Sequence, residues 1–252
     1  MAYNLNNEEV GISAEVAIAD AFNIRISPSY RERSNYDICE MLQPYLYDIF
    51  EIENIPYPKK HIAEGQNAVD FILENGKTLS VKTNQDNIGR SAPQKIGQPT
   101  HNTYFKHLKQ YLPDFDIKDA LNIHNFEDNY YNRAYFFKKI SIENIDVIIN
   151  AYWRNIFDCD YLILLYDIVS TDGNLYSKPH YKVFGKNAEL PCWDKRKFSF
   201  TQTVDSWTES CTLKYDGVSI GNFQVHNPEK RKCFKFRFDM NGISYLIENE
   251  LI

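Results

Sequence analysis

The sequence has few of the features that mark secreted, membrane or disulfide-stabilised proteins. Its five cysteines are odd in number, and none has C-x-x-C or zinc-type spacing. A reduced cytosolic protein is the simplest interpretation of that usage. The longest apolar run, residues 161–166, is too short to cross a bilayer, and the N-terminal residues lack the basic and apolar segments of a signal peptide. We therefore expect a cytoplasmic protein without a membrane partner.

Several catalytic signatures are absent too. The six histidines form no H-x-H or H-E-x-x-H pattern, which disfavours a zinc site and an HNH-type nuclease. There is no Walker loop and no G-x-G-x-x-G, so we expect no nucleotide cofactor. No G-x-S-x-G or cysteine-nucleophile pattern occurs either.

What is present is typical of a globular protein. The 252 residues are 43% hydrophobic, 25% charged and 15% aromatic. The net charge of -6 argues against a protein coated with nucleic acid, but an acidic body can carry a basic cleft. Residues 77–109 hold six Lys/Arg and one acid, and residues 230–237 hold five Lys/Arg and none. This sorting indicates two local basic surfaces, with solvated surface segments as the plain alternative.

Hydrophobic periodicity and turn residues predict an α/β protein. We expect helices at 7–22, 37–50 (interrupted near Pro44), 101–112 and 142–156, a hairpin at 68–83 and a buried strand at 160–169. Asn7 is the expected N-cap of the first helix. The C-terminal third is expected to be strand-rich, with turns at 216–217, 221–222 and 241–242. We predict one domain over 1–252, with a catalytic core at about 8–170 and a β-rich recognition part at about 195–252.

The hairpin holds the most informative pair of residues. Asp70 begins its first apolar run and Lys82 ends its second, and Asn75-Gly76 joins the two. Both side chains are therefore expected at the same end of the hairpin. A carboxylate and an ammonium held there can bind a divalent metal and orient a water, which suggests metal-dependent phosphodiester hydrolysis. A surface Asp–Lys pair without catalytic role is the alternative.

The order helix, hairpin, helix, strand resembles the PD-(D/E)xK nuclease superfamily, and within it the type II restriction endonucleases. Val69-Asp70 match the first half-motif and Ser80-Val81-Lys82 the second, with nine residues between Asp70 and Ser80. Many members also place a glutamate after a glycine on the first helix, a position that Glu15 occupies here. The matched segment covers roughly residues 8–112. It implies a restriction-endonuclease-like mixed β-sheet flanked by helices.

The resemblance implies a Mg²⁺-dependent, sequence-specific endonuclease for double-stranded DNA. Asp70 and Glu15 would bind the metal, and Lys82 would orient the nucleophile and offset charge on the phosphorane. Ser80 departs from the motif, which has an acid there, so metal binding shifts onto Asp70 and Glu15. Glu53 and Glu64 are further candidates for the missing carboxylate.

Two segments supply the expected DNA contacts. One is the loop at 89–100, and the other is the alternating stretch at 221–237. Gln amides suit base edges, while Arg and Lys reach phosphates or guanine. The candidates are Arg90, Gln94, Lys95, Gln98, Gln224, His226, Arg231, Lys235 and Arg237.

Three alternatives stay open beside this hypothesis. A repair or recombination nuclease of the same fold would read DNA structure, and a protein with a decayed site would bind DNA without cutting it. An interaction module would show no salt-dependent DNA binding. A homodimer would suit a palindromic site, although some restriction enzymes act as monomers. A restriction enzyme would be expected in the prokaryotic cytoplasm.

Overall fold

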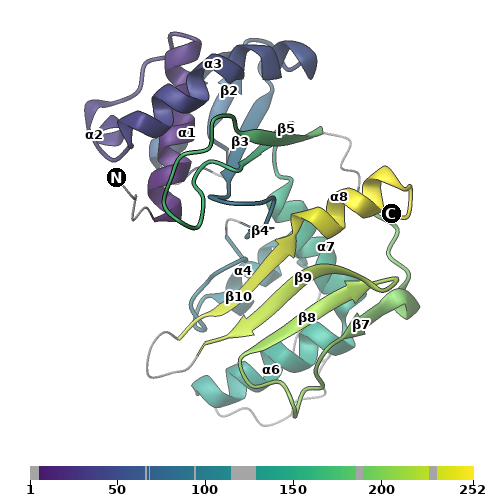
Figure 1. Ribbon diagram of the computed structural model, residues 1–252. Helices are drawn as coiled ribbons and strands as arrows, with labels where there is room; N and C mark the ends of the chain where they lie inside the picture. The colour runs from purple at the N-terminus through teal and green to yellow at the C-terminus, as the bar shows by residue number, and fades with distance from the viewer. Residues whose placement is uncertain are drawn as a thin grey trace. The chain divides into compact units, whose positions relative to one another are not determined.

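The computed structural model describes residues 6–65, 67, 69–93, 95–114, 129–185, 190–226 and 232–252. The chain forms two compact units, each built around its own β-sheet (Figure 1). Unit 1 is Met1–Gly89 with Phe157–Glu189, and unit 2 is Arg90–Ile156 with Leu190–Ile252. The predicted α/β class is confirmed. Among the described residues, no helix combines the length and apolar character needed to cross a membrane.

Unit 1 contains a mixed sheet with the order β1-β2-β3-β5-β6. Its central pair, β3 and β5, is parallel, and the other pairs are antiparallel. The predicted hairpin and the predicted strand at 160–169 are thereby confirmed as β2–β3 and β5. The strands are β1 (Pro58–His61), β2 (Phe71–Leu73), β3 (Thr78–Thr83), β5 (Tyr161–Tyr166) and β6 (His180–Gly185).

Two predicted helices of unit 1 are confirmed, with local corrections. Asn6, rather than Asn7, caps the first helix, and its side chain accepts the Glu9 N–H at 2.8 Å. Pro44 does not interrupt the other helix, because it lies on the exposed side, where water can solvate the carbonyl left unpaired. The helices are α1 (Asn7–Ala21), α2 (Pro28–Arg31) and α3 (Tyr36–Ile52), with a short 3₁₀ turn at Ala63–Gly65.

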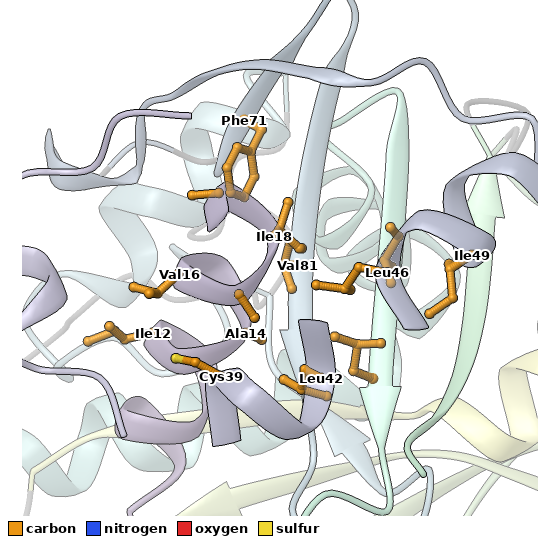
Figure 2. Packing of buried hydrophobic residues seen from close by; sticks show 14 of the residues in the cluster. Ile12, Ala14, Val16, Ile18, Cys39, Leu42, Leu46, Ile49, Phe71 and Val81 are labelled. Atoms are coloured by element: carbon orange, nitrogen blue, oxygen red, sulfur yellow. The ribbon is translucent and has the colours of Figure 1, made fainter. Parts of the chain in front are cut away.

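The core of unit 1 is mostly aliphatic. Figure 2 shows α1 and α3 packed together beside the sheet, with Ala14 and Ile18 of α1 near Leu42 and Leu46 of α3. Alanines on α1 let the two helices approach closely. Val81 of β3 points into the same cluster. Alternation along the strand therefore directs the neighbouring residues of β3 away from this core.

Unit 2 contains an antiparallel sheet with the order β4-β10-β9-β8-β7. In Figure 1, α6 and α7 lie behind this sheet. The strands are β4 (Arg90–Ser91), β7 (Phe198–Phe200), β8 (Ser210–Tyr215), β9 (Val218–Val225) and β10 (Phe234–Asp239). The helices are α4 (Tyr104–Tyr111), α6 (Tyr130–Glu143), α7 (Ile145–Ile156) and α8 (Met240–Glu248), with a 3₁₀ turn at Lys195–Lys197.

The helix expected at 142–156 is confirmed as α7, although it begins at Ile145 and a separate helix, α6, precedes it. Two other sequence predictions for unit 2 were wrong. The turn expected at 221–222 lies inside β9, where Gly221 admits the Phe236 ring: a Cβ there would come within 2.7 Å of it. The turn expected at 241–242 is instead the first turn of α8, capped by Asp239.

Aromatic rings fill the core of unit 2. Phe236 of β10 lies 4.2 Å from Tyr152 of α7 and 4.5 Å from Phe223 of β9, measured between ring centroids. Phe137 of α6 stacks on Phe234 at 4.6 Å. The alternating phenylalanines of β10 thus face the helices, and the residues between them point to the opposite face of the sheet.

Candidate active site

The β2–β3 hairpin places Asp70 against the start of its second strand. Gly76 adopts φ +81° in the connecting turn, a conformation that glycine adopts without strain. The Asp70 N–H donates to the Leu79 carbonyl at 2.9 Å. The Asp70 carboxylate then accepts two hydrogen bonds at Oδ2, from the Val81 N–H at 2.6 Å and from the Ser80 hydroxyl at 3.2 Å. Ser80 therefore supports Asp70 directly.

Glu15 comes to the same region from α1. It is 8% exposed, and its Oε2 accepts two hydrogen bonds from side chains of other elements. The Tyr30 hydroxyl of α2 donates at 2.7 Å, and Nε2 of His61, the last residue of β1, lies at 2.8 Å. Sequence reasoning had not singled out Tyr30 or His61. Neither belongs to a local motif, because only the packing of α1, α2 and β1 joins them.

The two carboxylates interact electrostatically. Burial and then the charge of Glu15 raise the pKa of Asp70 to about 6, although Lys82 and the hydrogen bonds from Val81 and Ser80 act against the rise. Asp70 is only 5% exposed. Two acids held close in a buried position make a site that favours a cation.

Lys82 lies half-buried near this pair. Its ammonium lowers the pKa of the Asp70 carboxyl, yet no ion pair joins the two side chains. The same ammonium lowers the pKa of the Cys159 thiol, although burial dominates and raises that pKa to about 12. The Lys82 ammonium is therefore not held in an ion pair with Asp70, and its charge can act on a ligand bound beside the two acids. The Cys159 thiol stays protonated and unreactive at neutral pH.

Each carboxylate keeps one oxygen without a partner in the described part of the chain. The donors to Glu15 all bind Oε2, and those to Asp70 all bind Oδ2. Carboxylate oxygens are the ligands that Mg²⁺ prefers, and Mg²⁺ keeps several waters beside one or two of them. The two free carboxylate oxygens therefore suit Mg²⁺ as ligands. Among the residues with described positions, no group of three or more His, Cys, Asp or Glu could hold a metal ion.

The two alternative acids lie elsewhere. Glu64 accepts the Ser27 N–H at 3.1 Å and lies 3.8 Å from Nδ1 of His61. Glu53 follows the last turn of α3 and interacts with Tyr181. No described contact joins either carboxylate to Asp70, so Glu15 is the acid that the structure brings to it.

The expected DNA-contacting residues that the structure describes all lie in unit 2. Gln94 and Arg231 fall outside the described residues. Of the other loop candidates, Lys95 is exposed and Gln98 is half-buried. The N–H of Lys95 donates to Oδ1 of Asn155 at 2.9 Å, which fixes the loop backbone on α7.

The strand candidates share one face of the sheet. Lys235 pairs with Gln224, and Arg237 pairs with Asn222. Asp239, the next residue of β10 on this face, pairs with Arg90 of β4. His226 directly follows β9, two residues after Gln224. These polar and cationic side chains therefore lie on the face opposite the phenylalanines of β10, and their role in DNA binding stays a prediction.

A comparison with curated proteins finds a match to a restriction enzyme. The chain is similar to the type II restriction enzyme CviAII of Paramecium bursaria Chlorella virus 1, with 30% identity over 186 residues. The aligned region covers 74% of this chain and 46% of that enzyme, so the chain spans about half the length of the relative it matches. No protein-family model matches the chain. No solved structure matches it either.

Proposed function

We propose that the protein is a restriction endonuclease that hydrolyses phosphodiester bonds in double-stranded DNA. The observation that carries this proposal is the buried Asp70–Glu15 pair beside Lys82, in a chain similar to a type II restriction enzyme. Buried acids whose pKa is raised by burial and by a neighbouring acid, as that of Asp70 is, concentrate at functional sites. A surface Asp–Lys pair would show neither burial nor a second acid.

We further propose that Asp70 and Glu15 hold Mg²⁺ through their unpartnered oxygens. The ion would supply a positive charge that polarises the scissile phosphate. Ser80 then serves as a donor that orients Asp70, and Glu15 supplies the acid that the motif places at position 80. Lys82 would orient the attacking water and offset charge developing on the phosphate.

Unit 2 would provide contacts to the DNA backbone. Burial lowers the pKa of the Arg237 guanidinium, and the nearby charge of Arg90 lowers it further. The two guanidinium groups therefore lie close enough to repel each other. Neither guanidinium forms an ion pair with a described acid. Asp239, opposite Arg90, instead accepts the Gly242 N–H at 3.4 Å and the Ser219 hydroxyl at 3.3 Å. A phosphate is the natural counter-ion for such an arginine pair.

Gln224 and Lys235 extend this face along the sheet. Their direct pairing across β9 and β10 puts an amide and an ammonium side by side. An amide can bond a base edge, and an ammonium can bond a phosphate or guanine. We expect this face to contribute sequence preference as well as affinity. A second copy of the chain, acting on the other half of a palindromic site, remains a separate prediction.

Digestion of a mixed-sequence DNA substrate tests the proposal. With Mg²⁺ we expect discrete fragments, and sequencing their ends would give the site, the stagger and any palindromic symmetry. With EDTA we expect none. Cleavage confined to branched or single-stranded DNA would instead identify a structure-specific nuclease. Binding without cleavage at any Mg²⁺ or Mn²⁺ concentration would leave a non-catalytic DNA-binding protein.

A further inference from the structure

The hydrogen bonds to Glu15 are arranged asymmetrically. Tyr30 and His61 both lie within hydrogen-bond distance of Oε2, at 2.7 and 2.8 Å, and no described residue donates to Oε1. A carboxylate that binds a metal is ionised and only accepts hydrogen bonds, so in that state Nε2 of His61 would donate to Glu15. The two donors thus select which oxygen of Glu15 stays available.

Both donors are themselves held in place. The His61 side chain is fully buried, and its ring packs edge-on against Tyr30 and Phe71, with centroids 4.8 and 5.1 Å apart. Tyr30 belongs to α2, whose N-cap is Ser27. The N–H of Ser27 donates to Glu64, which approaches the other ring nitrogen of His61. Residues of α2, β1 and the 3₁₀ turn at Ala63–Gly65 therefore hold the carboxylate of Glu15 in place.

Residues that bind and orient a metal ligand typically change metal affinity by about 10–100-fold when removed. The contacts of Tyr30 and His61 with Oε2 of Glu15 are therefore expected to affect metal affinity.

We propose that Tyr30 and His61 are positioning residues that hold Glu15 by Oε2 and reserve Oε1 for a divalent cation. The proposal rests on the proposed function, because it takes Glu15 as a metal ligand. It goes beyond that function by assigning roles to two residues outside the nuclease motif. Neither residue touches the scissile phosphate in this assignment.

Mn²⁺ binding to the intact, DNA-free protein, followed by electron paramagnetic resonance, tests the assignment without relying on activity. Tyr30→Phe deletes one donor and keeps the ring, so we expect a Mn²⁺ dissociation constant about tenfold higher than in the wild type. His61→Leu should raise it at least as much, whereas His61→Gln, which can still donate a hydrogen bond, should recover part of the loss.

Tyr36→Phe is the matched control. The Tyr36 hydroxyl also donates to a glutamate, Glu40 at 2.5 Å, but on the exposed side of α3. Unchanged Mn²⁺ affinity in Tyr30→Phe, equal to that of Tyr36→Phe, would overturn the positioning role while leaving cleavage by the wild type intact. A wild type that shows no saturable Mn²⁺ binding and cuts no DNA would overturn the proposed function itself.

Discussion

The two units bury different chemistry. Among the described residues, the buried acids and the buried histidine, Glu15, Asp70 and His61, all belong to unit 1. The buried polar residues of unit 2 are neutral serines and asparagines. Its core instead contains most of the large buried aromatic side chains, while Lys235 and Arg237 lie on the opposite face of its sheet. Unit 2 therefore combines a rigid aromatic core with a polar face on its sheet.

This difference separates two possible tasks. Burying ionisable groups is unfavourable unless they are paired, so a cluster of them is retained where chemistry needs it. An aromatic core carries no such penalty and gives a sheet a rigid base on which exposed side chains can be displayed. We therefore expect substitutions in unit 1 to change the rate of cleavage, and substitutions on the polar face of unit 2 to change DNA affinity.

The largest effect is expected at Lys82. Lys82→Ala removes the cation that lowers the pKa of the Asp70 carboxyl, and we expect cleavage to fall at least about a thousandfold. Asp70→Ala should be equally inactive. DNA affinity, measured by fluorescence anisotropy in Ca²⁺, should change less than about threefold. Lys77→Ala, on the same hairpin, removes a lysine that contacts Tyr161 instead and serves as the control. Normal cleavage by Lys82→Ala would contradict the catalytic assignment.

The next effect concerns the aromatic core. Phe236 is fully buried, and Phe236→Ala should lower the free energy of unfolding by about 3–5 kcal/mol, as large-to-small core changes do. Chemical denaturation measures the loss. Hydrogen exchange should show lost protection in β9 and β10 while amides of β3 stay protected. Equal loss of protection in β3 would show that the two units unfold together. The contrast between unit 1 and unit 2 would then not extend to their stability.

The features predicted correctly from sequence depend on local contacts. Asn75-Gly76 and Asp216-Gly217 form tight turns in which the glycine has a positive φ, so short-range rules suffice. The alternation of β10 also determines which side chains face the core. The position of Asp70 beside Ser80 follows directly from that kind of local pairing.

The missed features depend on packing between distant segments. Gly221 resembles a turn residue, but it lies in β9 because Phe236 occupies the space above it. Gly242 lies in the first turn of α8, and glycine fits there because its Cα lies close to the Ser219 carbonyl, where a Cβ would come within 1.8 Å. The link from Glu15 to His61 spans 46 residues, so no motif could reveal it. Sequence patterns locate chemistry on an element, and only tertiary structure shows which elements meet.

A third, smaller effect is expected from the buried charge of Asp70. Its pKa is raised from 3.8 to about 6, so between those pH values the folded state holds the proton that the unfolded state has lost. Stability therefore falls as pH rises through this window, and the full penalty is present above it. At pH 8 in EDTA, Asp70→Asn should raise the free energy of unfolding by up to roughly 3 kcal/mol.

The same substitution should give almost no gain at pH 3.5, where the carboxyl is protonated in the folded state and mostly protonated in the unfolded state. Denaturation at the two pH values measures the difference. The exposed Asp172→Asn should stay within about 0.5 kcal/mol of the wild type at both. An equal gain for Asp70→Asn at both pH values would mean that the buried charge is not the cause.

The smallest effect is expected on the polar face of unit 2. Arg237→Ala removes one guanidinium of the Arg90–Arg237 pair, so DNA affinity should fall about tenfold and the salt slope should decrease by about one. Cleavage at saturating enzyme should be nearly unchanged. Arg196→Ala is the control, because the Arg196 guanidinium is exposed and already paired with Asp194 at 2.8 Å. A variant with normal affinity but slow cleavage at saturation would place Arg237 with the chemistry of unit 1 and break the division between the units.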